Sequence, residues 1–157
     1  MIETDIKDCY ILKASIYNDH RGSFSELHKA SSNSFNCKQV NYSFSKSGTL
    51  RGLHKAPYSK LVSCVYGKVF DVCVDLRPDS PTYMRSVYLN LDNNLEQLYI
   101  PPNCAHGFYA YTDSIILYLQ DGEYQKEKDE TFCYKSYNIP WPAKPIFISE
   151  KDEKICN

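Results

Sequence analysis

The chain has 157 residues, 24% of them charged, and a formal net charge of −1, so we predict a single domain over residues 1–157 with a stable core. The near-neutral charge gives no sign of a nucleic-acid or membrane surface, and no stretch reaches the roughly 18 apolar residues of a membrane helix. The opening stretch MIETDIKDCYILK contains acidic residues and no long apolar run, which argues against a signal peptide.

The seven cysteines are odd in number and show no C-x-x-C spacing, so a zinc site built from them is not expected. Cys64 and Cys73 fall inside apolar strand patterns, where a free cysteine behaves as a small hydrophobic residue. We therefore expect a cytoplasmic protein in a reducing environment, without a disulfide framework.

Almost every periodic segment indicates a β-strand, because Tyr, Val, Ile, Phe and Thr dominate short runs that end at turn residues. In chain order the strand-like runs are CYILKASIY (9–17), GSFSELH (22–28), CKQVNYSFSKSGTLRGLH (37–54), SKLVSCVYGKVFDVCVDLR (59–77), YMRSVYLNL (83–91), LEQLYIPPNCAHGFYAY (95–111) and IILYLQ (115–120). Several of these runs contain an internal turn, which gives eight or more strands at spacings near ten residues. This pattern predicts an antiparallel sandwich or barrel.

Two segments depart from the strand pattern. SELHKASSNSF (25–35) is the only weak helix candidate. YNIPWPAKPIFISEKD (137–152) carries three prolines, which favours a wrapped tail or an edge segment over a central strand.

Two strand runs each end with a histidine after a turn, in LRGLH (50–54) and PPNCAHGF (101–108). In a small jelly-roll barrel such strands can project their side chains into a common mouth, where a small ligand binds. RGLHKAPYSK (51–60) adds an arginine and a lysine to the first histidine.

These motifs, in one order along nearly the whole chain, resemble the dTDP-4-dehydrorhamnose 3,5-epimerase family. The matching stretches are DHRGSFSE (19–26), QVNYSFS (39–45), LRGLH (50–54), KLVSCVYGKVFDVCVDLRPDSPTY (60–83), QLYIPPNCAHGFYA (97–110), LY (117–118), WP (141–142) and ISEKD (148–152). The resemblance implies an all-β, cupin-type antiparallel jelly-roll barrel with a C-terminal wrapped tail. It also implies a nucleotide-diphosphate sugar as substrate and a homodimer that exchanges an N-terminal strand.

The chemistry of such a substrate defines the groups that an epimerase needs. A 4-keto sugar has acidic C–H bonds at C3 and C5, next to the carbonyl. Inversion requires a base on one face, a donor that stabilises the enolate, and an acid on the other face. No cofactor is needed, because the substrate carries its own carbonyl.

The resemblance assigns catalytic roles to four residues. It implies that His54 is the base and that Asp152 fixes its tautomer. Lys60 matches the lysine that faces the enolate oxygen, and Tyr124 is the candidate acid on the opposite face. The residues alone leave other interpretations open: a structural histidine, a solvated charged tail around Asp152, a strand-edge lysine and a surface tyrosine.

The chain has 14 tyrosines, so Tyr134 and Tyr137 compete with Tyr124 for the role of acid. The resemblance further implies that eight residues bind substrate: Arg21, Phe24, Glu26, Gln39, Asn41, Arg51, His106 and Lys151. A guanidinium binds phosphate oxygens in a bidentate manner, which suits Arg51 to a diphosphate. Without the resemblance, Arg21 and Glu26 could equally form a surface ion pair, and His106 could be a buried structural histidine.

The sequence departs from the family in two places. Only five residues, KAPYS, separate His54 from Lys60, where the family has a longer loop that contains glutamine, and the stretch before WP is also short. The sugar, the nucleotide base and the choice between inversion at C3 alone or at C3 and C5 therefore stay open, with dTDP-4-dehydro-6-deoxyglucose as the default substrate. Three alternatives are a 3,4-ketoisomerase, a metal-dependent cupin such as a dioxygenase, and an inactive sugar-nucleotide-binding module. We expect no bound metal, because His54 lacks the further ligands of a metal-binding cupin.

Overall fold

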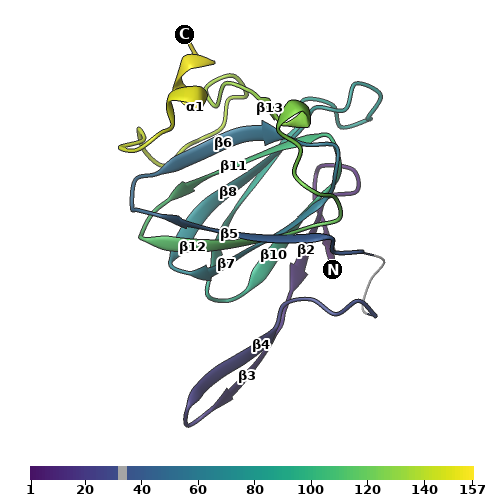
Figure 1. Cartoon of the computed structure of the whole chain (residues 1–157), viewed down its shortest axis with the longest axis vertical. Coiled ribbons are helices and arrows are strands. Elements are labelled where there is room, and N and C mark those ends of the chain that lie inside the picture. Colours follow the sequence, from purple (N-terminus) through teal and green to yellow (C-terminus); the bar gives the residue numbers. More distant parts are fainter. Residues whose placement is uncertain (32–34) are drawn as a thin grey trace.

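The computed structural model describes residues 1–31 and 35–157, and Figure 1 shows two curved sheets that face each other. The first sheet has six strands in the order β1 (Ile2–Glu3), β2 (Tyr10–Lys13), β10 (Glu96–Ile100), β7 (Lys60–Tyr66), β12 (Ser114–Gln120) and β5 (Gln39–Ser45). The second has five strands in the order β13 (Glu130–Thr131), β6 (Leu50–Lys55), β11 (Cys104–Ala110), β8 (Lys68–Asp75) and β9 (Ser86–Asp92). The paired strands of both sheets run antiparallel.

Four further elements of the described residues lie outside these sheets. Strands β3 (Ser15–Asp19) and β4 (Gly22–Glu26) form a separate hairpin that projects from the barrel at the bottom of Figure 1. A 3₁₀ turn, η1 (Lys126–Lys128), precedes β13, and the helix α1 (Glu150–Lys154) lies near the C-terminus, at the opposite end of the molecule from the hairpin.

The period-two pattern of β5 explains how the first sheet presents polar groups to the barrel interior. Val40, Tyr42 and Phe44 are exposed on the outer face of β5. The alternate residues of β5 face the other way: Asn41 pairs with Tyr118 across β12, and Ser45 is buried. One end of the barrel interior is therefore polar, whereas most of the rest is filled by apolar side chains.

The main core lies between the two sheets and contains Val62, Leu98, Phe108 and Leu91, all at most 1% exposed. Cys64 and Cys73 are buried in the same cluster, which confirms that these cysteines pack as small hydrophobic residues. This apolar layer holds both sheets in register beneath the polar end.

The C-terminal tail covers the second sheet with a cluster of its own. The Trp141 ring packs on Phe70 of β8 at a centroid distance of 5.9 Å and donates through Nε1 to the Tyr134 carbonyl at 2.9 Å. Tyr137 and Ile148 pack against the same cluster. The prediction of a wrapped C-terminal tail is thereby confirmed.

Two expectations from the sequence are wrong. The weak helix candidate at 25–35 is not helical in its described part: Ser25 and Glu26 belong to β4, residues 27–31 are irregular, and 32–34 lie outside the described residues. The expected absence of disulfides is also wrong, because Cys133 and Cys156 form one, 23 residues apart.

None of the described helices is long and apolar enough to cross a membrane.

Candidate active site

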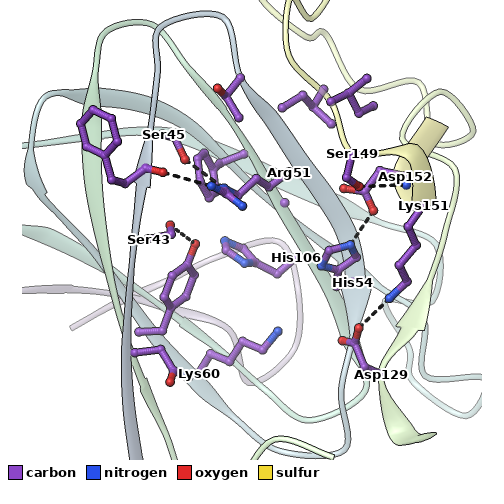
Figure 2. A pocket seen from close by; sticks show the side chains of 18 of the residues that line it. Ser43, Ser45, Arg51, His54, Lys60, His106, Asp129, Ser149, Lys151 and Asp152 are labelled. Carbon is purple, nitrogen blue, oxygen red and sulfur yellow. Dashed lines mark hydrogen bonds and ion pairs between the residues drawn. The ribbon is translucent and has the colours of Figure 1, made fainter. Parts of the chain in front are cut away.

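A cavity of about 730 Å³ opens at the polar end of the barrel, within the size range of small-molecule sites. Residues from β5, β6, β7, β11, β12 and the C-terminal tail line it, and Figure 2 shows their polar side chains around one space. The polar lining includes Asn41, Ser43, Ser45, Arg51, His54, Tyr58, Lys60, His106, Tyr118, Gln120, Tyr124, Asp129, Ser149, Lys151 and Asp152.

Strand pairing brings the two motif histidines together. His54 on β6 lies directly opposite His106 on β11, so both rings leave the sheet on the same side. Gly52 makes this close pairing possible: its φ is +116°, and a Cβ there would lie 2.6 Å from the Gly107 Cα. The glycine of RGLH is therefore needed by the geometry of the two strands.

His54 is bound by a carboxylate from the far end of the chain. Its Nε2 lies 2.6 Å from Asp152 Oδ1, and the Asp152 side chain is almost fully buried. The Gly52 N–H donates to the other carboxylate oxygen at 3.1 Å, which fixes the plane of the carboxylate. Because an ionised carboxylate only accepts hydrogen bonds, Nε2 of His54 donates and Nδ1 carries the lone pair that can take a proton.

The start of α1 is built to hold this carboxylate. Ser149 is the N-cap, and its hydroxyl accepts a hydrogen bond from the Asp152 N–H at 3.1 Å. Burial alone raises the pKa of Asp152. The hydrogen bond and charge of His54 lower it, as do the hydrogen bonds with Gly52 and Ser149, and the net result is a pKa below the usual value. Asp152 is therefore ionised at neutral pH and ready to stabilise a protonated His54.

His106 has a carboxylate partner of its own. Its Nε2 lies 2.8 Å from Asp71 Oδ1, and Asp71 on β8 is fully buried. The second oxygen, Asp71 Oδ2, has no hydrogen-bond partner among the described residues. The Asp71 contact fixes the orientation of the His106 ring at the back of the cavity.

Lys60 points its ammonium into the cavity from the first position of β7. Its Nζ lies 6.0 Å from the centre of the Tyr58 ring. Burial lowers the pKa of Lys60, and the charge of Asp129 opposes this shift only in part. An ammonium with a lowered pKa is a stronger hydrogen-bond donor to an enolate oxygen.

Three phenols line the cavity, on Tyr58, Tyr118 and Tyr124. Tyr124 is about half exposed, and its N–H donates to Gln39 Oε1 at 2.8 Å. The Tyr118 hydroxyl lies 3.1 Å from Ser43 Oγ, and burial raises its pKa well above the usual value. Tyr124 is therefore the most accessible of the three to a ligand.

A row of side-chain amides connects β5 and β12 to Tyr124. Gln39 donates to Asn41 Oδ1 at 3.0 Å, and Asn41 in turn donates to Gln120 Oε1. Asn41 lines the cavity, whereas Gln39 does not and instead binds the Tyr124 backbone. In a single copy of the chain Gln39 thus contacts the Tyr124 backbone, and its contact with substrate stays a prediction.

Arg51 lies at the opposite end of the cavity from Lys60 in Figure 2. Its Nε donates to Ser45 Oγ at 2.9 Å and its Nη2 donates to the Phe44 carbonyl at 3.0 Å. At the rim Lys151 forms an ion pair with Asp129 at 2.9 Å. A fixed guanidinium at one end suits an anionic ligand group there.

Comparison with known proteins gives consistent matches. The sequence profile of the family described as dTDP-4-dehydrorhamnose 3,5-epimerase matches residues 3–157. The dTDP-4-dehydrorhamnose 3,5-epimerase of Shigella flexneri is 39% identical, over 97% of this chain and 92% of its own length. The chain belongs to the dTDP-4-dehydrorhamnose 3,5-epimerase family.

Two solved structures extend the likeness to the fold. The dTDP-6-deoxy-D-glucose-3,5-epimerase of Legionella pneumophila, solved in complex with dTDP-4-keto-L-rhamnose, has a TM-score of 0.92 at 35% identity and covers 98% of this chain and 89% of that chain. A 3'-monoepimerase from Streptomyces bikiniensis, in complex with dTDP-quinovose, has a TM-score of 0.91 at 27% identity and covers 98% and 85%. The predicted family, the antiparallel cupin-type fold and the epimerase class of isomerase are confirmed.

Within this epimerase-family chain, three predicted residues do not reach the cavity. Arg21, Phe24 and Glu26 lie on the β3–β4 hairpin. Arg21 forms an exposed ion pair with Asp19 at 2.6 Å, and Phe24 is 65% exposed. In a single copy of the chain none of these three residues lines the cavity.

The two competing tyrosines also lie elsewhere, since Tyr134 and Tyr137 pack with the C-terminal tail. The sequence-based interpretation missed Asp71, Tyr58, Tyr118 and Gln120. Asp71 had a detectable signal, because an aspartate inside the apolar run KVFDVCVD requires a buried partner. Tyr118 and Gln120 had no signal beyond strand alternation, and Tyr58 lies in a loop without such a pattern.

Proposed function

We propose that the cavity inverts a dTDP-linked 4-keto-6-deoxy sugar by moving a proton between two faces of its ring. The observation that carries this proposal is the convergence of the buried His54–Asp152 pair and the Lys60 ammonium on one cavity. A ligand that spans the cavity can place its diphosphate at Arg51 and its sugar between His54 and Lys60. The likeness of the chain to structures that hold dTDP-4-keto-L-rhamnose and dTDP-quinovose supports dTDP as the nucleotide.

In this mechanism His54 removes the proton from a ring carbon next to the ketone, and Asp152 stabilises the imidazolium that forms. The negative charge moves to the sugar O4, where the Lys60 ammonium donates to it. Tyr124 then delivers a proton to the opposite face of the same carbon. His106, held by Asp71, positions the sugar from the back of the cavity.

We also propose that the active protein is a homodimer in which the β3–β4 hairpin completes the cavity of the partner subunit. Tyr17 and Phe24 expose more than half of their surface on this hairpin. The edge strand β5 adds three exposed apolar side chains, Val40, Tyr42 and Phe44, beside the same cavity. A dimer would cover these groups and would bring Arg21, Phe24 and Glu26 to a nucleotide.

The test is incubation of the purified protein with dTDP-4-dehydro-6-deoxyglucose in deuterated water, followed by NMR of the sugar protons. We expect deuterium at C3, C5 or both, together with inversion at the exchanged carbons. The GDP-linked 4-keto sugar is the matched control for the nucleotide and should react more slowly. No exchange with either sugar would overturn the proposal, and migration of the carbonyl to C3 would indicate a ketoisomerase instead.

A further inference from the structure

The disulfide between Cys133 and Cys156 joins the segment after β13 to the segment after α1, and both of these elements contact His54 or its strand. Cys156 lies two residues beyond α1, the helix that carries Asp152. Cys133 lies two residues beyond β13, the strand that pairs with the strand of His54. The disulfide therefore links the helix that carries Asp152 to the strand that pairs with the His54 strand.

The β13 side of this link is fixed firmly to the base strand. Thr131 is the direct pairing partner of His54, and Phe132 and Leu53 exchange backbone hydrogen bonds of 2.8 and 3.2 Å. Lys55 adds an ion pair with Glu130 at 3.0 Å. The segment that holds Cys133 thus moves as one unit with His54.

The α1 side has little packing of its own. The helix has five residues, and Asp152 is the one that is buried. Ile155, at the C-cap, is 50% exposed. The Lys151–Asp129 ion pair is exposed on the lysine side, and such pairs contribute little to stability.

We propose that the Cys133–Cys156 disulfide is a positioning element of the active site, which holds Asp152 against His54 by tying the end of α1 to the β13 segment. This inference rests on the proposed function of His54 as the base. A cross-link limits how far the two joined segments can separate. Without it, α1 is held by its polar contacts and by the packing of Ile148 just before its N-cap, so Asp152 spends less time in contact with His54.

The same arrangement makes catalysis sensitive to thiol redox state. A dithiol such as dithiothreitol breaks the S–S bond, forms thiols on Cys133 and Cys156, and is itself oxidised to a cyclic disulfide. The other five cysteines are free, so no second disulfide contributes to the response. The cavity-lining groups Arg51, Lys60 and His106 sit on barrel strands and keep their places.

The test compares oxidised and dithiol-reduced enzyme, with a Cys133→Ser/Cys156→Ser double variant as the matched control. We expect reduction to lower kcat about threefold to tenfold and to change KM less. This loss is smaller than the roughly 100-fold loss in rate that a 1 Å misplacement of a catalytic group causes, because Asp152 would still contact His54 part of the time. The double variant should resemble reduced enzyme and should not respond to the dithiol. Reduction of Asp152→Asn enzyme should cause little further loss, because the amide no longer supplies the negative charge that the disulfide holds against His54.

A second readout does not depend on catalysis. The Gly52 amide donates to Asp152, so its hydrogen exchange should speed up on reduction while exchange in the middle of β8 stays unchanged. Equal kcat and equal Gly52 exchange in both redox states would overturn the inference. An equal percentage loss in Asp152→Asn enzyme would also overturn it, since the disulfide would then act on general stability. If oxidised enzyme inverts no 4-keto sugar, the proposed function fails, and the Gly52 exchange alone decides the role of the disulfide.

Discussion

His54 and His106 lie directly opposite each other on adjacent strands, yet each binds a carboxylate from a different part of the fold. His106 is 5% exposed and its partner Asp71 lies in the barrel core, so this pair is a rigid part of the scaffold. The His54 side chain is 32% exposed, and its partner Asp152 comes from the short C-terminal helix. His106 is thus held rigidly, whereas His54 is the more accessible of the two, as its proposed role as the base requires.

Asp152→Asn should preserve the fold and lower kcat by on the order of 10²-fold or more, because an amide cannot stabilise the imidazolium. The pKa of Asp152 is lowered in the folded state, so its ionised form contributes stability at neutral pH that is lost as the pH falls through that lowered pKa. The stability gap between wild type and variant should therefore shrink on acidification. Steady-state kinetics and denaturant unfolding at several pH values measure both effects. Glu153→Gln, at the exposed neighbouring residue, serves as the control. If Asp152→Asn has the same kcat as wild type, the segment around Asp152 is a solvated tail without a role in catalysis.

Lys60→Met keeps the length of the side chain and removes its ammonium. Because the enolate charge forms only during reaction, kcat and kcat/KM should both fall by roughly 10²-fold or more, with little change in dTDP affinity. The lowered pKa of Lys60 also predicts that wild-type kcat declines with rising pH below the usual lysine range, as the ammonium loses its proton. Lys68→Met, on exposed Lys68 of β8, is the matched control and should keep full activity. A variant that mainly loses dTDP affinity would place Lys60 in the diphosphate site.

Tyr124→Phe should separate hydrogen exchange from inversion. His54 can still remove and return a proton on its own face, so deuterium should enter the sugar faster than the configuration changes. NMR of the sugar in deuterated water measures both rates in one sample. Tyr58→Phe and Tyr118→Phe are matched variants from the same cavity and should keep exchange and inversion in step. If Tyr124→Phe inverts at the native rate while one of the others shows the split, that other phenol is the acid.

The β3–β4 hairpin can be tested by mixing two inactive variants. If Arg21 acts in the partner's cavity, a hybrid dimer of Arg21→Ala and His54→Ala subunits contains one intact site. Co-expression of the two variants should then restore activity that neither homodimer has. Sedimentation should show a species of twice the monomer mass. A monomer, or a hybrid dimer with no activity, would contradict the proposed exchange.

The sequence predicted the elements whose signals are local. Strand alternation, the turn residues and the order of the motifs were enough to place Arg51, His54, Lys60 and His106 at one mouth. Asp71 falls inside the apolar run KVFDVCVD, which indicates a buried partner, but only the fold identifies that partner as His106. The disulfide likewise depends on the path of the tail, which no local pattern describes.

The loop between His54 and Lys60 shows the same limit at the other end of the cavity. Five residues bring Tyr58 close to Lys60, and the Tyr58 ring packs so tightly on Gly122 that a Cβ there would lie 2.7 Å from the Tyr58 Cβ. The sequence revealed the loop length but not this contact. The bond between Gln39 and the Tyr124 N–H could not be predicted for a similar reason, since the two residues are 85 positions apart in the sequence.

The proposed role of His54 as the base is tested most directly by deuterium exchange in the His54→Ala variant. The variant and wild type are incubated with dTDP-4-dehydro-6-deoxyglucose in deuterated water, and NMR follows C3 and C5. We predict that the variant binds dTDP with native affinity and incorporates no deuterium at either carbon above the uncatalysed rate. Near-native exchange at either carbon in a variant that still binds dTDP would contradict the account.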